Sequence, residues 1–277
     1  MTPWIAVRGA GDLATGTIVR LANCGFRVFA MECESPSAIR RQVALSEAVY
    51  DGTATVEGVT CRRIAHMSQA ETVWRSGEVP LLVDTQAVCI TDLAPAVVVD
   101  AILAKRNLGT HRDMAPITIA LGPGFTAGQD VDAVIETMRG HNLGRVLYTG
   151  MALRNTGVPA LIGGYGAERV IHAPADGALR CAQDKNGKSI GIGSVVQRGQ
   201  IIAYVGDTPV AATLDGVLRG LIRTGYPVMT GLKIADIDPR IEQKENCNTI
   251  SDKARSIAGG VVEAMLWLAK QRGITLS

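Results

Sequence analysis

Hydrophobic residues in the first 150 positions form short β-branched runs separated by amphipathic segments. This alternation is typical of an α/β domain built on a largely parallel sheet. The pattern predicts helices at residues 14–24 and 67–75 and a small hairpin at residues 53–62. It predicts strands at residues 4–7, 27–31, 79–83, 97–103, 117–121 and 145–148.

The segment that begins at Val131 fits two patterns. A helix face with the spacing i, i+3, i+4, i+7 would contain Val131, Val134, Ile135 and Met138. So short a run of β-branched residues also suits a strand, because the two structures share this composition when the run is brief. The helical spacing is the stronger signal, and we predict a helix here.

After about residue 165, glycines and short alternating runs replace the helical pattern, and an internal repeat is present. Residues 173–180 (APADGALR) align with residues 212–219 (ATLDGVLR), and each copy is followed by a GxxVxxGxxI block. Glycine supplies positive-φ turns between short strands. Two such halves resemble the barrel-sandwich hybrid of biotinyl and lipoyl domains. The junction at residues 205–209 has no lysine, which argues against a swinging-arm carrier.

These patterns divide the chain into three parts. We predict a Rossmann-like cofactor- or nucleotide-binding domain at residues 1–165, a barrel-sandwich hybrid at residues 166–240 and a C-terminal helical segment at residues 241–277. The last segment should form a helix that is entered at Ser251, whose side chain can accept from early backbone N–H groups. The apolar face that packs this helix onto a domain is expected to contain Val261, Met265, Leu266 and Leu268.

Composition and charge exclude several classes of protein. Hydrophobic residues make up 47% of the chain and charged residues 19%, which excludes a disordered protein. No apolar run reaches the ~18 residues of a membrane span, so we expect no membrane partner. The 28 basic and 26 acidic residues give a charge of +2 without a long basic block, so we expect no nucleic-acid partner. No signal-peptide pattern is visible, which favours a cytoplasmic location.

The six cysteines and four histidines are scattered, with no CxxC or CxxH pair. In a cytoplasmic protein this spacing favours single thiols over disulfides or a zinc site. We therefore predict no metal. A site assembled from distant residues stays open as the alternative, because metal ligands need to converge only in space.

The strongest candidate for ligand binding is VRGAGDLATG at residues 7–16, which follows the first predicted strand and opens the first helix. In this GxGxxA pattern, Gly9 allows a tight turn and Gly11 lets the backbone approach a pyrophosphate. Glu32 ends the second predicted strand, where an acidic residue is expected to accept from a ribose hydroxyl. A purely structural turn between strand and helix is the alternative.

A second glycine-rich loop, LGPGFTAG at residues 121–128, follows another predicted strand. Gly122, Gly124 and Gly128 give it the glycine density that lets backbone N–H groups converge on an anion. The loop lacks the Lys-Ser/Thr ending of a Walker loop, so nucleotide hydrolysis by that mechanism is not supported. A structural turn and a ligand-binding loop both stay open.

Charged residues near these loops are further candidates. Asp12 either faces an approaching anion or caps the first helix. A polar cluster of Glu136, Arg139 and His141 would bind an anion or move a proton, with His141 and Glu136 as the candidate catalytic residues. A structural role for His141 is the alternative. The residues expected to neutralise phosphate charge are Arg8, Arg139 and Arg145.

Taken together, these blocks resemble one family, the selenium-dependent molybdenum hydroxylase accessory proteins of the YqeB type. Two departures are Asp84-Thr85, where members often have Asp-Pro, and Leu153-Arg154, where members often have Glu-Pro. The matching stretches cover nearly the whole chain and are VRGAGDLATG (7–16), SEAVYDG (46–52), VEGV (56–59), LGPGFTAG (121–128), ETMRGHNLGRV (136–146), NTG (155–157), GLKIADIDP (231–239) and TISDKAR (249–255).

The resemblance implies an accessory or maturation factor that equips a molybdenum hydroxylase with a mature, selenium-containing molybdenum cofactor. Expected partners are the hydroxylase apoenzyme or other cofactor-assembly proteins, a small phosphate-bearing ligand and a second copy of the chain in a homo-oligomer. The Rossmann-like part also resembles xanthine dehydrogenase accessory proteins, which handle molybdopterin, so the implied ligand is a molybdopterin-type cofactor or a nucleotide.

Two other functions stay open. One is an NAD(P)-dependent oxidoreductase that uses the same GxGxxA loop and Glu32, with His141 as proton donor. The other is a ligand-free docking module, in which the repeated barrel binds the hydroxylase or another assembly factor.

Overall fold

The computed structural model describes residues 3–154, 157 and 161–276, which belong to two compact units. Unit 1 comprises residues 1–36, 44–156 and 250–277, and unit 2 comprises residues 37–43 and 157–249. The chain thus enters unit 2 at Ser37 and again at Gly157, both before the expected boundary at residue 165. It returns to unit 1 for the last time at Ile250 rather than at residue 241. Asn155 and Thr156 of the NTG stretch lie outside the described residues.

Unit 1 is built on a nine-stranded sheet with the order β10-β9-β7-β6-β1-β2-β5-β4-β3. Neighbouring strands from β9 to β4 run parallel, and the pairs at the two edges, β10 with β9 and β3 with β4, are antiparallel. The predicted α/β class with a large, mainly parallel sheet is confirmed. The strands are β1 (Trp4–Arg8), β2 (Arg27–Glu32), β3 (Thr53–Val56), β4 (Val59–Ile64), β5 (Val79–Val83), β6 (Val97–Asp100), β7 (Ile117–Leu121), β9 (Ala133–Ile135) and β10 (Val146–Leu147).

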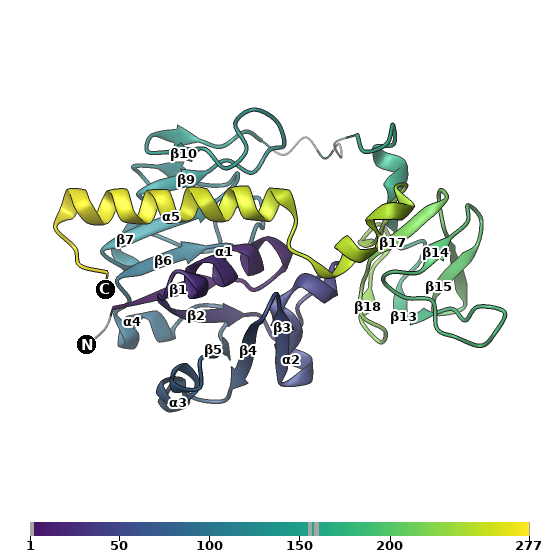
Figure 1. Cartoon of the computed structure of the whole chain (residues 1–277), viewed down its shortest axis with the longest axis horizontal. Coiled ribbons are helices and arrows are strands. Elements are labelled where there is room, and N and C mark those ends of the chain that lie inside the picture. The colour runs from purple at the N-terminus through teal and green to yellow at the C-terminus, as the bar shows by residue number, and fades with distance from the viewer. Residues whose placement is uncertain (1–2, 155–156, 158–160, 277) are drawn as a thin grey trace. The chain divides into compact units, whose positions relative to one another are not determined.

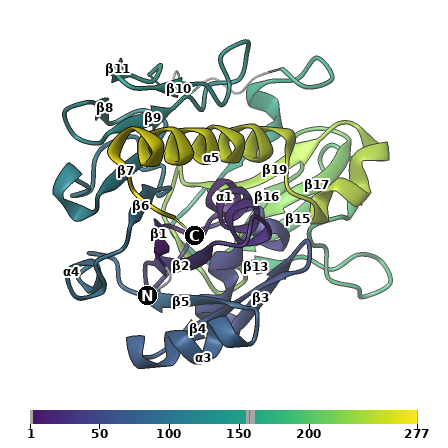
Figure 2. The same ribbon diagram turned by 60° about the vertical axis from the view of Figure 1, so that its left-hand side comes forward.

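Helices lie on both faces of this sheet (Figures 1 and 2). On one face α1 (Asp12–Asn23) and α5 (Asp252–Arg272) pack side by side, and α5 also contacts β7, β9 and β10. On the other face α3 (Ala70–Arg75) and α4 (Cys89–Leu93) pack with strand residues such as Phe29 and Met31. The central strands are therefore buried on both sides, which explains their continuous apolar runs.

Several short elements complete unit 1. They are α2 (Ala48–Asp51), the 3₁₀ turns η2 (Leu45–Glu47), η3 (Met67–Gln69) and η4 (Arg112–Met114), and a two-stranded sheet of β8 (Thr126–Ala127) and β11 (Gly150–Met151). The predicted helix at residues 67–75 is thus a 3₁₀ turn followed by a short α-helix, and the predicted hairpin at residues 53–62 is β3 and β4.

The predicted C-terminal helix is confirmed as α5. The Ser251 side chain accepts a hydrogen bond from the Ala254 amide at 3.2 Å and caps its start. Of the predicted apolar face, Leu266 is an exception, because its side chain is 49% exposed. At 3.6 residues per turn, Leu266 points away from the buried Val261 and Met265.

The predicted helix that begins at Val131 is wrong. Residues Ala133–Ile135 form β9, which pairs in parallel with β7 and is fully buried. A strand covered on both faces is apolar at every position, so its residues also satisfy a helical spacing. The pairing partner in β7 decides between the two structures, and spacing alone does not reveal it.

Unit 2 contains two four-stranded antiparallel sheets, with the orders β12-β19-β17-β14 and β16-β15-β13-β18. Their strands are β12 (Val170–His172), β13 (Gly177–Cys181), β14 (Val195–Val196), β15 (Ile201–Val205), β16 (Thr208–Ala211), β17 (Gly216–Leu221), β18 (Pro227–Val228) and β19 (Lys233–Asp238). The 3₁₀ segments of this unit are η1 (Arg41–Val43), η5 (Ala167–Arg169) and η6 (Ile241–Asn248).

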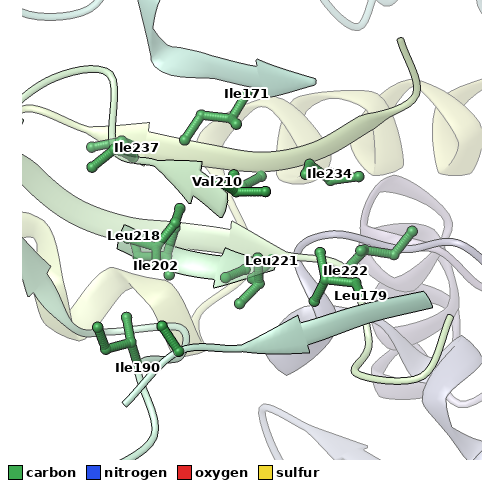
Figure 3. Packing of buried hydrophobic residues seen from close by; sticks show 14 of the residues in the cluster. Ile171, Leu179, Ile190, Ile202, Val210, Leu218, Leu221, Ile222, Ile234 and Ile237 are labelled. Atoms are coloured by element: carbon green, nitrogen blue, oxygen red, sulfur yellow. The ribbon is translucent and has the colours of Figure 1, made fainter. Parts of the chain in front are cut away.

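The two sequence repeats of unit 2 exchange strands. The first copy supplies β13, β14 and β15, and the second supplies β17, β18 and β19. Because β13 pairs with β18 and β14 pairs with β17, each copy adds one strand to the sheet of the other. Apolar residues from both copies, among them Ile202 and Leu218, share one core (Figure 3). The finer assignment to a barrel-sandwich hybrid stays a prediction.

Among residues 3–154, 157 and 161–276, no helix combines the length and the apolar character needed to cross a lipid bilayer.

Candidate functional site

The carboxyl ends of the parallel strands of unit 1 meet at one edge of the sheet. The chain continues from β1 to β2 on one side, whereas β6, β7 and β9 extend the sheet on the other side. In open α/β sheets, ligands bind outside the carboxyl ends of the strands where the strand order reverses in this way. The first glycine loop leaves β1 at this point, so we take this edge as the candidate site.

Gly9 and Gly11 occupy different surroundings in this loop. Gly9 has a φ of +94°, and a Cβ atom there would lie 2.9 Å from the carbonyl oxygen of Ala101. Glycine is therefore required for the loop to pack against the backbone that follows β6. Gly11 has an extended backbone with φ −64° and ψ −176°, and a Cβ atom there would meet no atom within 4 Å. The space beside Gly11 is thus open to a ligand.

The start of α1 presents backbone donors at the same place. Gly11 is the N-cap residue, and it has no side chain that could cap the helix. The Asp12 carboxylate accepts from the neighbouring Leu13 amide at 2.9 Å, so it satisfies one early donor of the helix. The amino end of a helix carries a partial positive charge, which favours an anion. The Asp12 carboxylate reduces this field.

Glu32 lies beside the glycine loop, as the motif predicts. Its Oε2 accepts from the Ala10 amide at 2.8 Å, and its Oε1 accepts from the Cys33 amide at 2.8 Å. Both carboxylate oxygens therefore already hold the loop and the end of β2 in place. Burial, followed by the charge of Glu32, raises the pKa of the Cys33 thiol to about 11. This thiol is protonated at neutral pH and is a poor nucleophile.

Arg8 belongs to a buried group that we call the Asp100 cluster, formed by Arg8, Asp100 and Thr110. The Arg8 guanidinium donates to the Thr110 hydroxyl, which in turn donates to the Asp100 carboxylate. Arg8 Nη1 and Asp100 Oδ2 are 3.8 Å apart, and these two side chains are 3% and 2% exposed. Burial raises the pKa of Asp100. The expected contact between Arg8 and a phosphate has no support in this enclosed position.

The second glycine loop is packed against protein. A Cβ atom on Gly122 would lie 2.6 Å from Thr137 Oγ1, and one on Gly124 would lie 2.7 Å from the backbone of Arg106. Both glycines have positive φ values, +76° and +111°. Crowding by the protein therefore accounts for Gly122 and Gly124. Gly128 is exposed, and a Cβ atom there would lie 3.6 Å from the Tyr148 carbonyl oxygen, an ordinary contact distance.

The predicted cluster of Glu136, Arg139 and His141 is not assembled. Glu136 is 3% exposed, and its carboxylate accepts from the Met138 amide at 2.7 Å and the Leu153 amide at 2.9 Å. A buried carboxylate requires such donors, so Glu136 organises two loops. His141 is exposed, and within the described chain no hydrogen bond joins it to Glu136 or Arg139. The proposed proton transfer between them has no geometric basis.

Two further residues of this stretch, Arg139 and Gly144, contact α5. Arg139 makes two hydrogen bonds to the Asp252 carboxylate, at 2.8 and 2.9 Å. A Cβ atom on Gly144 would lie 2.6 Å from the Ser256 carbonyl oxygen, so this glycine permits the loop to touch the helix. Arg145 is exposed and remains available for an anion.

The sequence analysis missed Lys253 as a residue of this site. α5 approaches α1 so closely that a Cβ atom on Gly16 would lie 2.8 Å from the Ala254 Cβ. This contact joins the first turn of α5 to the second turn of α1. Lys253 is half-buried there and interacts electrostatically with Asp12. Lys253 belongs to the TISDKAR stretch, but a local sequence pattern does not show that α5 begins beside the glycine loop.

The charge of Lys253 is destabilised in this position. Burial, followed by repulsion from Arg139, lowers the pKa of its ammonium group. Asp12 and Glu136 act in the opposite direction. An anion that enters the open space beside Gly11 would add a favourable partner for this ammonium.

The groups at this edge suit an anion better than a metal ion. They comprise the backbone of Gly11, the first turn of α1 and the Lys253 ammonium. The Asp12 and Glu32 carboxylates at this edge already accept from backbone amides. In the part of the chain that the structure describes, no group of three or more His, Cys, Asp or Glu side chains is arranged to hold a metal.

Known proteins include a clear relative of this chain. The chain is 49% identical over 267 residues to YqeB of Escherichia coli K12, described as an uncharacterized protein, and this match covers 96% of the chain and 48% of YqeB. The chain thus spans about half the length of the curated relative that it matches. No protein-family model matches the chain.

A solved structure also shows a weak likeness. It is the product-bound structure of the ectoine utilization protein EutE (DoeB) from Ruegeria pomeroyi, with 12% identity, 85% coverage of each chain and a TM-score of 0.25. This likeness is too low to support an argument about fold or function. At 49% identity across nearly its whole length, the chain is a homologue of YqeB.

Proposed function

We propose that the carboxyl edge of the sheet in unit 1 binds a phosphate-bearing cofactor, either of the molybdopterin type or a nucleotide. The observation that carries this proposal is the open space beside Gly11, at the uncapped start of α1 and near the Lys253 ammonium. Backbone donors at a helix start together with a nearby cation form a common arrangement for phosphate binding.

The order of the strands supports the same proposal. When the hairpin of β3 and β4 is set aside, the order β5-β2-β1-β6-β7-β9 corresponds to 3-2-1-4-5-6 in chain sequence. This is the order of Rossmann-like sheets, which bind dinucleotides next to their first strand. In this reading Gly9 and Glu32 shape the loop, while Gly11 and Lys253 face the ligand.

The proposed cellular role is maturation of a selenium-dependent molybdenum hydroxylase. It rests on the sequence resemblance described above. In this role the protein would bind the cofactor, or a precursor of it, and pass it to the hydroxylase apoenzyme. A direct test is to measure hydroxylase activity in cells that produce wild-type protein or the Gly11→Val variant. Equal activity in both would contradict a role for this site in maturation.

The Gly11→Val substitution also tests binding in the purified protein. Any residue can adopt the backbone conformation of Gly11, and no atom lies within 4 Å of the new Cβ. The variant should therefore fold. The added side chain would fill the ligand's space. We expect at least about tenfold weaker binding of molybdopterin preparations, CTP or ATP in thermal-shift titrations, a loss of about 1.4 kcal/mol. Unchanged affinity in a folded variant would refute the proposal.

Lys253→Gln provides a second variant that leaves the glycine loop intact. Removal of one cation should weaken phosphate binding by about tenfold, because a charge-assisted hydrogen bond contributes about 1.5–3 kcal/mol. Lys270→Gln, an exposed position near the other end of α5, is the matched control and should bind as the wild type does. Equal losses in both variants would indicate a non-specific charge effect.

The identity of the ligand can be tested with the protein as purified. Heat denaturation followed by mass spectrometry of the released small molecules would reveal a pterin, a cytidine compound or a nicotinamide. A pterin or cytidine compound that stabilises the protein on re-addition would support cofactor handling.

An NAD(P)-dependent oxidoreductase is the second candidate, favoured by the contact of 2.8 Å between Glu32 and the Ala10 amide. This contact supports Glu32 as a candidate ribose acceptor, because it keeps the carboxylate beside the glycine loop. Titration with NADH or NADPH can be followed through the fluorescence of Trp4, Trp74 or Trp267. Absence of both a saturable change and turnover would discard this candidate.

A further inference from the structure

A second concave site lies at the opposite edge of the same sheet, where β7 and β9 begin. It is a hollow of about 360 Å³, and its walls come from three parts of unit 1. Residues 111–116 precede β7, Gln129 and Asp132 precede β9, and Arg272 is the last residue of α5. α5 runs along the sheet from the candidate site to this edge (Figure 1).

One buried carboxylate organises the hollow. Asp132 is 2% exposed in its side chain, and it accepts from the Thr118 amide at 2.9 Å. It also lies 2.8 Å from nitrogen atoms of both Arg112 and Arg272. Burial alone would raise the pKa of Asp132, but these donors outweigh it and lower the pKa. Asp132 is therefore ionised at neutral pH, and it fixes both guanidinium groups.

The two arginines retain capacity for another anion. They carry two positive charges against the single charge of Asp132, and their side chains are 45% and 33% exposed. A guanidinium that is already fixed loses little freedom when it binds a phosphate or carboxylate. Asp113 also lines the hollow and reduces its positive charge. Asp113 and Arg112 are both exposed, so solvent and salt screen their charges.

We propose that this hollow binds a small molecule through a phosphate or carboxylate group that contacts Arg112 and Arg272. Its volume lies at the lower end of the range for small-molecule sites, about 300–1,000 Å³. Gln129, on the rim, supplies a neutral donor and acceptor for the rest of the ligand. This site is separate from the glycine loop and does not depend on the function proposed for that loop.

The test uses calorimetric titration of the full chain with inorganic phosphate and, separately, with citrate. Gln129→Glu adds a negative charge to the wall of the hollow without removing a partner of Asp132. Arg112→Gln removes one guanidinium and leaves Arg272 to pair with Asp132. We expect each variant to weaken binding by at least about tenfold, the loss typical of one charge-assisted contact.

Two controls make the outcome decisive. Arg75→Gln, on α3 with a side chain that is 76% exposed, should bind as the wild type does. Gly11→Val should also retain binding, because it alters the other edge of the sheet. The proposal is overturned if neither probe binds saturably to the wild type. It is also overturned if Gln129→Glu and Arg112→Gln bind as tightly as Arg75→Gln, or if Gly11→Val abolishes binding. The stronger probe identifies the group recognised.

Discussion

The two edges of the sheet in unit 1 hold buried aspartates whose pKa values are shifted in opposite directions. Asp100 lies at the carboxyl edge and Asp132 near the amino edge, and each side chain is 2% exposed. Arg8 is 3.8 Å from Asp100, whose pKa is raised by burial. Two arginines lie 2.8 Å from Asp132, whose pKa is lowered despite its burial. Equal side-chain exposure is therefore accompanied by opposite pKa shifts.

Deeper enclosure of Asp100 and the closer charged donors of Asp132 together explain this difference. Burial disfavours the charged carboxylate in both places, and at Asp132 the two guanidinium groups and the Thr118 amide reverse the effect. Asp132 acts as a framework that ties the end of α5 to the strands through Arg272. Asp100 is a less completely neutralised group behind the glycine loop. Asp132 thus holds the last turn of α5 at the amino edge through Arg272. The first turn of the same helix carries Lys253 at the carboxyl edge.

Asp132→Asn should cause the largest loss of stability. The variant removes the buried anion that Arg112 and Arg272 contact. Both guanidinium groups stay partly exposed to solvent, so we expect the loss of these charge-assisted hydrogen bonds to cost about 3 kcal/mol. Urea unfolding at neutral pH measures this loss. Because the folded pKa of Asp132 lies below its unfolded value, its stabilisation is complete above the ordinary carboxyl pKa. It is lost as the pH falls through the folded pKa, so the difference between variant and wild type should shrink in acid. A constant difference would contradict this origin.

Gly9→Ala should have the next largest effect. Alanine at a φ of +94° is strained, and its Cβ would lie 2.9 Å from the Ala101 carbonyl, so we expect a loss of about 2 kcal/mol. Gly11→Ala is the matched control. It has open space and an ordinary backbone, so the loss should stay below about 1 kcal/mol. Similar melting temperatures for the two variants would show that the contact with Ala101 does not determine the loop.

The sequence predicted those parts of the fold that depend on local patterns. Strands such as β5 are recognisable in the sequence as apolar runs, and Ser251 marks the start of α5 through its capping side chain. The first glycine loop and Glu32 also lie together as the motif requires. In each of these cases the residues that determine the structure are neighbours in sequence or belong to one motif.

The remaining features depend on partners far away in the chain. β9 is a strand because β7 lies beside it, and Lys253 enters the site because α5 packs on α1. Glycines show the same limit: Gly124 meets the backbone of Arg106, whereas Gly11 meets open space, although both belong to glycine-rich loops. Sequence composition does not distinguish a glycine that admits a ligand from one that admits the protein's own backbone.

Asp100→Asn should have the smallest effect and would sharpen the comparison with Asp132. The pKa of Asp100 is higher in the folded protein than in the unfolded chain. The free energy of unfolding that this group contributes therefore falls as the pH rises through the unfolded pKa toward the folded value. A neutral amide avoids this loss, but it forfeits the charge facing Arg8 and part of the hydrogen bonding with Thr110. We expect these effects to offset each other to within about 1 kcal/mol in urea unfolding at neutral pH. A loss as large as that of Asp132→Asn would mean that Asp100 is held as firmly as Asp132, and that donor distance does not explain the difference between the two edges.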